Sequence, residues 1–220
     1  MVLSRTRFVV LLLAFSLFAF AKAKEFVMPK ASPAITYPAH DQHPNEKVTI
    51  AADPYDMADK ASIFQINYAG GGYLPVFMVF TNDGDTPVSM NNLEVEFITH
   101  NRDKIPAATA EDLYRRFTHT KNGDNANAKR IPLPVPSGPK VGVKKGQRDE
   151  INDAMFAAKA VAPHETQAGF MFFDVSDISH PLAGGRIIVS GVNNTNGQEL
   201  MYFEIPMENY LTASGTTASH

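Results

Sequence analysis

The chain has 220 residues, with 20 Lys and Arg against 23 Asp and Glu, a formal net charge of −3 and no cysteine. A weakly acidic chain does not carry the basic surface of a general nucleic-acid binder, and the absence of cysteine excludes a disulfide framework, a thiol nucleophile and a thiolate metal site. The length suits one domain with short appendages.

The first 23 residues follow the pattern of a secretory signal peptide. Arg5 and Arg7 precede an apolar run, and Ala21-Lys22-Ala23 places small residues around a cleavage site. The run of about 14 apolar residues is shorter than the roughly 20 that a membrane-spanning helix needs. We expect removal of residues 1–23 and an extracytoplasmic location, periplasmic or secreted, with 17 basic and 23 acidic residues left. An uncleaved membrane anchor is the alternative.

Residues 24–47 contain four prolines and little periodicity, which predicts an extended lead-in. A β domain is expected over 48–210. The apolar run at 73–80 suits a strand that is buried on both faces. Alternation of apolar and polar residues, the pattern of half-buried strands, occurs over 48–52, 63–68 and 93–99.

Two short helices are expected in an insert that spans 100–161. Thr109 is a suitable N-cap for a helix over 109–117, and a second helical stripe covers 149–161. Between them, residues 118–148 are poor in large apolar side chains and rich in Asn, Gly, Pro and Lys. We interpret 118–148 as an excursion on the surface of the domain.

The stretch PHETQAGFMFFDV begins with Pro163, which ends the second helix, and continues at Gly169 into an aromatic run. Aromatic enrichment over this length predicts a strand against a packed core. The segments GRIIVSGV and ELMYFEIP indicate two more strands, joined by the loop NNTNGQ. The total of about seven to nine strands predicts a mainly β chain, an antiparallel β-sandwich, followed by a polar tail over 211–220.

Two segments carry a family resemblance. VFMVFTNDGDTPVSMNNLEVEF and VAPHETQAGFMFFDV resemble the telokin-like, immunoglobulin-fold domains of bacterial extracytoplasmic proteins, in the turn at 82–85 and in the approach and strand at 163–173. The resemblance covers roughly 74–99 and 163–206. It implies an immunoglobulin-like sandwich in a bacterial protein, and it implies little about function because one fold serves many functions.

The sequence contains no recognised enzyme motif. A G-x-S-x-G elbow, a P-loop and an H-E-x-x-H pair are all missing, since His164-Glu165 has no second histidine at the required spacing. Nothing pairs a nucleophile with a base. We therefore expect a protein that is not an enzyme and needs no cofactor.

His40-Asp41-Gln42-His43 is the candidate metal site. Two imidazoles three residues apart can share one ion if the backbone turns, and Asp41 could add an oxygen ligand. The flanking prolines favour the alternative, in which His40 and His43 belong to a solvated linker.

A basic run stands out in this acidic chain. Six basic residues occur without an intervening acid, and they are Lys129, Arg130, Lys140, Lys144, Lys145 and Arg148. Clustered charge steers association, so the run is a candidate contact for an anionic partner or an envelope surface. A solvated loop is the alternative.

Together these patterns predict a secreted or periplasmic β-sandwich module that binds or scaffolds an unknown extracytoplasmic protein or envelope component. The alternative is an extracytoplasmic protein that binds a metal or a small molecule through the His40/His43 segment. Neither nucleic acid nor a transmembrane segment after signal removal is expected.

Overall fold

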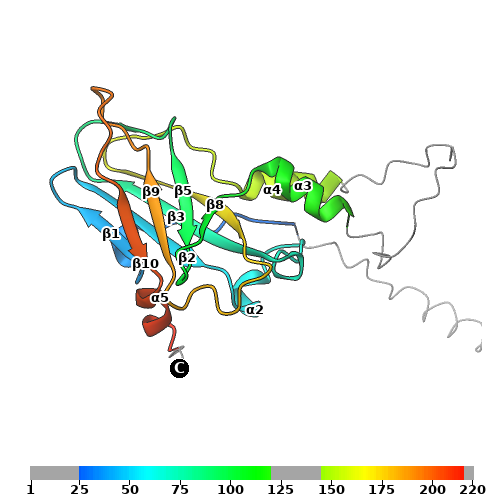
Figure 1. Cartoon of the computed structure of the whole chain (residues 1–220). Coiled ribbons are helices and arrows are strands. Elements are labelled where there is room, and N and C mark those ends of the chain that lie inside the picture. The colour runs from blue at the N-terminus through cyan, green and yellow to red at the C-terminus, as the bar shows by residue number, and fades with distance from the viewer. Residues whose placement is uncertain (1–24, 120–144, 216–220) are drawn as a thin grey trace, which may run out of the picture.

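The computed structural model describes residues 25–119 and 145–215, and its fold is mainly β (Figure 1). The predicted signal peptide, most of the 118–148 excursion and the end of the chain lie outside these residues. Two four-stranded sheets and one two-stranded sheet contain the strands, and every strand pair is antiparallel. The mainly β prediction is confirmed.

The first sheet has the strand order β1-β2-β3-β8. Its strands are β1 (His40–His43), β2 (Val48–Pro54), β3 (Tyr73–Asn82) and β8 (Glu165–Asp174). β3 and β8 pair over their whole length, from Tyr73 opposite Asp174 to Asn82 opposite Glu165. Every residue of β3 is buried, which confirms the prediction of a strand buried on both faces.

The second sheet has the order β10-β9-β5-β6. Its strands are β5 (Glu94–Ile98), β6 (Lys104–Pro106), β9 (Arg186–Ser190) and β10 (Phe203–Pro206). The two-stranded sheet pairs β4 (Val88–Ser89) with β7 (Ala160–Val161).

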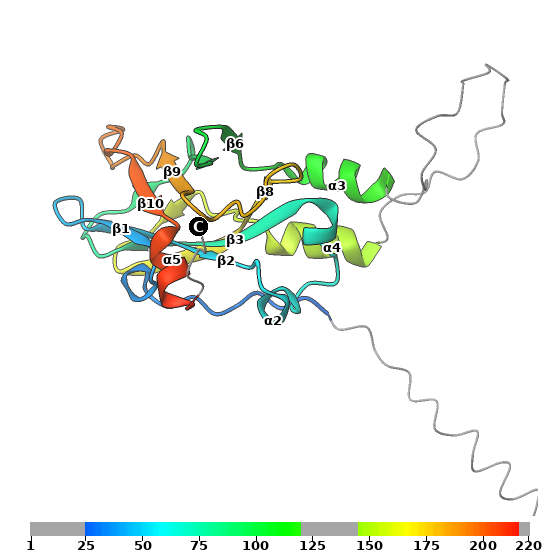
Figure 2. The same ribbon diagram turned by 60° about the horizontal axis from the view of Figure 1, so that its bottom comes forward.

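Helices lie at the margins of the sheets (Figure 2). They are α2 (Ala58–Ala61), α3 (Ala110–His119), α4 (Lys145–Ala154) and α5 (Glu208–Ala213), with 3-10 turns η2 (Ala34–Thr36) and η3 (Ala69–Gly71). α3 and α4 lie side by side at one end of the sheets in both views (Figures 1 and 2). No helix of the described ranges is long and apolar enough to cross a membrane.

Strand β8 explains the aromatic run of the sequence. Its side chains alternate between the two faces of the first sheet: Phe170 and Phe172 enter one buried cluster, and Met171 and Phe173 enter another. Both faces of this sheet are therefore covered, and the predicted strand is confirmed.

The cluster that holds Met171 and Phe173 is the inter-sheet core, because it joins side chains of both four-stranded sheets, such as Ile50, Phe97 and Val189. The cluster that holds Phe170 and Phe172 is the aromatic layer. It lies on the other face of the first sheet, where it is covered by the N-terminal segment, the 55–72 connection and helices α3 and α4.

The edges of the two sheets meet on both sides of the molecule. On one side β1 lies beside β10, and the Asp41 carboxylate oxygen Oδ2 accepts the N–H of Glu204 at 2.8 Å. On the other side the N–H of Ala108, which follows β6, donates to the carbonyl of Phe172 in β8 at 2.8 Å.

The N-terminal segment differs from the extended lead-in expected over 24–47. β1 is a strand of the first sheet, with His40 opposite Ala51 of β2. Ala34 is fully buried, and its N–H donates to the Thr81 hydroxyl at 2.8 Å. The segment docks through backbone groups and through scattered side chains such as Phe26 and Ala34, which leave no periodic pattern in the sequence.

Residues 63–68 form turns and not the strand that their alternation predicted. Ile66 and Tyr68 are buried as the pattern implies. However, the backbone N–H groups of Gln65 and Ile66 donate to the Glu150 carboxylate, not to a neighbouring strand. The buried carboxylate of a distant helix thus accepts the two N–H groups that would otherwise donate to the carbonyl groups of a neighbouring strand.

The two predicted helices are present with shifted ends. α3 confirms the helix expected over 109–117, and the Thr109 hydroxyl accepts the N–H of Asp112 at 3.2 Å, as an N-cap does. α4 begins and ends earlier than the helix expected over 149–161. After it ends, the N–H of Phe156 donates to β8, and two further residues form β7.

The limits predicted for the insert and for the C-terminal tail also differ from the structure. β6 and β7 lie within the predicted insert 100–161 and pair with other strands, so these two parts of the insert belong to the sheets. The predicted polar tail 211–220 begins inside α5, where Leu211 is buried in the inter-sheet core.

Candidate functional site

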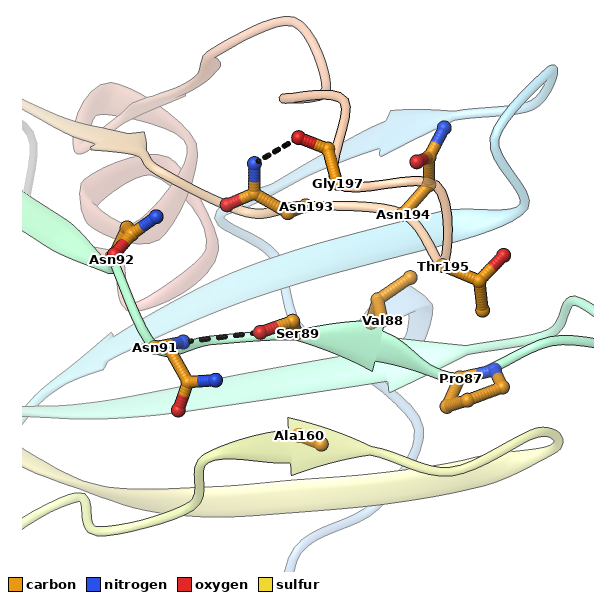
Figure 3. Close-up of a pocket in the computed structure, with 10 residues that line it drawn as sticks. All are labelled: Pro87, Val88, Ser89, Asn91, Asn92, Ala160, Asn193, Asn194, Thr195 and Gly197. Carbon is orange, nitrogen blue, oxygen red and sulfur yellow. Dashed lines mark hydrogen bonds between the residues drawn. The ribbon is translucent and has the colours of Figure 1, made fainter.

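A cavity of about 500 Å³ lies where three separate segments of the chain meet, and we call it the loop-end cavity (Figure 3). The segment around β4, strand β7 and the loop after β9 each contribute to it. Its lining residues are Pro87, Val88, Ser89, Asn91, Asn92, Ala160, Asn193, Asn194, Thr195 and Gly197.

Backbone hydrogen bonds fix the walls of the loop-end cavity. Ser89 and Asn193 exchange two backbone bonds of 2.7 and 3.0 Å, which hold the β4 segment against the loop. Within the loop, Asn194 Oδ1 accepts the N–H groups of Asn196 at 2.9 Å and Gln198 at 3.0 Å. Such side-chain to backbone bonds stabilise a turn, so the cavity is preformed.

All ten lining residues of the loop-end cavity are uncharged. Asn91, Asn92 and Thr195 are exposed, and within the described ranges their side chains have no hydrogen-bond partner. Amides donate and accept, and a hydroxyl does both. Asn193 Oδ1 is buried without a partner among the same residues. The cavity therefore offers neutral hydrogen-bonding groups to a ligand.

A second cavity of about 390 Å³ borders α2 and the aromatic layer, and we call it the aromatic cavity. Large apolar side chains, small side chains and polar groups all contribute to its walls. They come from Tyr55, Asp56, Ala58, Ala61, Ser62, Phe64, Gln65, Ile66, Asn67, Tyr68, Ala69 and Pro75.

An ammonium group is held beside the aromatic cavity. Lys60 Nζ is 2.5 Å from Asp53 Oδ1 and 3.0 Å from the Pro54 carbonyl. The same nitrogen lies 5.2 Å from the ring centre of Tyr55 and 4.7 Å from that of Tyr210. Burial raises the pKa of Asp53, and Lys60 acts against that rise. Burial also raises the pKa of Tyr55, to about 12.

Glu150 of α4 fixes one wall of the aromatic cavity. Its carboxylate accepts the N–H of Gln65 at 2.7 Å and the N–H of Ile66 at 3.1 Å. Its side chain is buried, and burial raises the pKa of the carboxyl against the two backbone donors. The Tyr68 hydroxyl is buried near this carboxylate without a hydrogen bond of ordinary geometry. The group acts as a buried acceptor that ties α4 to the 62–68 segment.

His40 and His43 lie in strand β1 and not in a turn. Residues three apart in a strand point to opposite faces of the sheet. His40 Nδ1 is 2.6 Å from the Tyr37 carbonyl oxygen, and the His43 ring stacks on Phe203 with centres 3.9 Å apart. Within the described residues, no group of three or more His, Asp or Glu could hold a metal ion, so the structure gives this metal prediction no support.

Most of the predicted basic contact segment falls outside the described residues, namely Lys129, Arg130, Lys140 and Lys144. Lys145 and Arg148 lie in α4. The Arg148 guanidinium is 5.3 Å from the centre of the Tyr114 ring of α3. Arg148 therefore contributes to the contact between the two helices, and the role of the other five residues stays a prediction.

Sequence patterns did not reveal either cavity. The loop NNTNGQ indicates only a hairpin connection. Its contact with the segment around Ser89 depends on residues about 100 positions away in the chain. The density of Asn in both segments is the one signal that could have indicated a polar site.

No protein-family model matches the chain, and neither the search of curated proteins nor the search of solved structures found a match. Function is therefore inferred from the two cavities and from the sequence.

Proposed function

We propose that the chain is an extracytoplasmic binding module of the immunoglobulin-like β-sandwich type, which binds another envelope component through its loop-end cavity. Two antiparallel four-stranded sheets that share a buried core support the sandwich. The apolar run and small-residue site at the N-terminus support export.

The observation that carries the proposal is the chemistry of the loop-end cavity. Its volume of about 500 Å³ is in the range of ligand sites. Asn91, Asn92 and Thr195 present exposed neutral donors and acceptors to solvent from preformed segments. These groups match main-chain amides and uncharged side chains of a protein partner. A lining without ionisable side chains favours binding over general acid–base catalysis.

Site-specific photocross-linking tests this proposal. A photoreactive phenylalanine derivative at position 195, in the loop-end cavity, should yield one covalent adduct with an envelope component, which mass spectrometry would identify. The matched control places the same group at exposed position 209 of α5, at the opposite end of the sheets (Figure 1).

The double variant Asn91→Ala, Thr195→Ala should lower the affinity for that partner by about thirtyfold, since each of the two lost neutral hydrogen bonds costs on the order of 1 kcal/mol. Asn209→Ala should leave the affinity unchanged. An adduct at position 209 with none at 195 would place the binding surface elsewhere.

A further inference from the structure

We propose that the aromatic cavity binds a compact organic ammonium ion, meaning a protonated amine or a quaternary ammonium group on a small apolar body. This ligand and this site are separate from the partner and the loop-end cavity of the proposed function.

The shape and lining of the aromatic cavity suit a small ligand with an apolar body. Its volume of about 390 Å³ falls in the usual range of small-molecule sites. Tyr55, Phe64 and Tyr68 line it together with Pro75, and α2 contributes only the methyl groups of its two alanines. Large aromatic side chains and the small side chains of Ala58 and Ala61 thus line the same cavity.

The charge around the cavity favours a cation. Asp56 lines the cavity. Asp53 and Asp59 are three positions before and after Asp56 in the chain. Lys60 is the adjacent cation, and it is engaged by Asp53 and by the Pro54 carbonyl. Asp53 is therefore paired with Lys60, and an organic cation in the cavity would offset the charge of the Asp56 carboxylate, which lines it.

The protein already stabilises one ammonium group here with the same chemistry. Lys60 Nζ lies between the rings of Tyr55 and Tyr210 at 5.2 and 4.7 Å, distances within the range of a cation–π contact. Tyr55 is shared between this contact and the lining of the cavity. A second ammonium in the cavity would meet an aromatic wall and a carboxylate, as Lys60 does.

The groups that would hold the ligand are fixed in advance. The Tyr210 hydroxyl donates to Asp56 Oδ1 at 2.7 Å and so orients the carboxylate. Glu150 anchors the backbone of Gln65 and Ile66, which also line the cavity. Little ordering is needed on binding, which lowers the entropic cost.

Calorimetric titration of the purified protein tests the proposal with choline and phenethylamine as probes, each compared with its neutral counterpart, dimethylbutanol and phenylethanol. At least one cation should bind about tenfold or more tightly than its neutral counterpart, since a desolvated cation–π contact and a nearby carboxylate both favour the charged ligand. Tighter binding of choline would identify a quaternary ammonium ligand, and tighter binding of phenethylamine an aromatic amine.

Asp56→Asn should weaken binding of the cation by about tenfold, because the amide oxygen still accepts the Tyr210 hydroxyl and only the charge is removed. Asp59→Asn is the matched control on α2, since Asp59 does not line the cavity, and it should change the affinity by less than about threefold. Equal binding of the neutral compounds, an unchanged affinity in Asp56→Asn, or no binding of either cation would each overturn the proposal.

Discussion

The inter-sheet core and the aromatic layer cover opposite faces of the first sheet, yet they are built in different ways. Strands of the two four-stranded sheets supply most of the inter-sheet core, with side chains that alternate along each strand. The aromatic layer combines residues of β2, β3 and β8 with residues of connections and helices that are far apart in the chain, such as Phe26, Phe64 and Phe117. Local periodicity produces the first cluster, whereas long-range docking produces the second.

The largest expected loss of stability tests whether the aromatic layer contributes as much to the free energy of unfolding as the inter-sheet core does. Phe172 belongs to the layer and Phe173 to the core, and both are fully buried in β8. We expect Phe172→Ala and Phe173→Ala each to lower the free energy of unfolding by about 3–5 kcal/mol, as large core truncations do. Urea denaturation measures both losses. A loss below about 1 kcal/mol for Phe172→Ala alone would show that the layer is only loosely attached.

Glu150→Gln tests the polar tie between α4 and the 62–68 segment. A carboxylate accepts from Gln65 and Ile66 through separate oxygens, whereas an amide has one acceptor oxygen and would place its own N–H group against a donor. We expect a loss of about 1–3 kcal/mol in the free energy of unfolding. The exposed Asp153→Asn on the same helix is the control and should change it by less than about 0.5 kcal/mol.

The loss of stability in Glu150→Gln should depend on pH with a definite sign. Burial raises the pKa of Glu150 above its ordinary value of 4.5, so the folded protein binds a proton there more readily than the unfolded chain does. Stability from this group therefore rises as the pH falls through the raised pKa toward 4.5. The destabilisation by Glu150→Gln should be larger at pH 4.5 than at about pH 7. A loss that is the same at both values would contradict this.

The lowered pKa values of Asp112 and Asp174 act in the opposite direction. Their stabilising effect is lost as the pH falls through those pKa values. Both carboxylates are present in the wild type and in Glu150→Gln, so their contribution cancels in the difference between the two proteins.

The smallest loss of stability is expected for a residue outside both the inter-sheet core and the aromatic layer. Lys104 and Glu96 form an ion pair of 3.1 Å on the second sheet, and the lysine side chain is 69% exposed. Lys104→Ala should cost less than about 1 kcal/mol, and added salt should reduce even that loss. A larger loss that salt does not change would show that the aliphatic part of Lys104 packs on the sheet.

Sequence patterns predicted the parts of the fold that depend on local order. Strands with alternation or with a long apolar run were found at β2, β3, β5 and β8, and the Thr109 cap located α3. The strand predicted over 63–68 was wrong. Alternation of apolar and polar residues indicates which side chains are buried, but it does not indicate which group accepts the backbone N–H groups, and here that group is the Glu150 carboxylate. β1 was missed because its segment docks without a periodic pattern.

The candidate sites were harder to predict for the same reason. The loop-end cavity joins the segment around Ser89 to the loop at Asn193, and the aromatic cavity joins α2 to the 64–69 segment and Pro75. Each residue is ordinary for its local setting. The cavities form only because these segments come together in the tertiary structure, and no sequence motif predicts that contact.

The meeting of the sheet edges has a consequence for how the protein behaves at high concentration. An uncovered strand edge is a template for pairing with other copies, and such pairing starts aggregation. Here the N–H of Glu204 on β10 is occupied by Asp41, and the carbonyl of Phe172 on β8 is occupied by Ala108. These intramolecular contacts use backbone groups that would otherwise be open to a neighbouring molecule. In a chain without disulfides, such contacts leave fewer edge groups free to start pairing between copies.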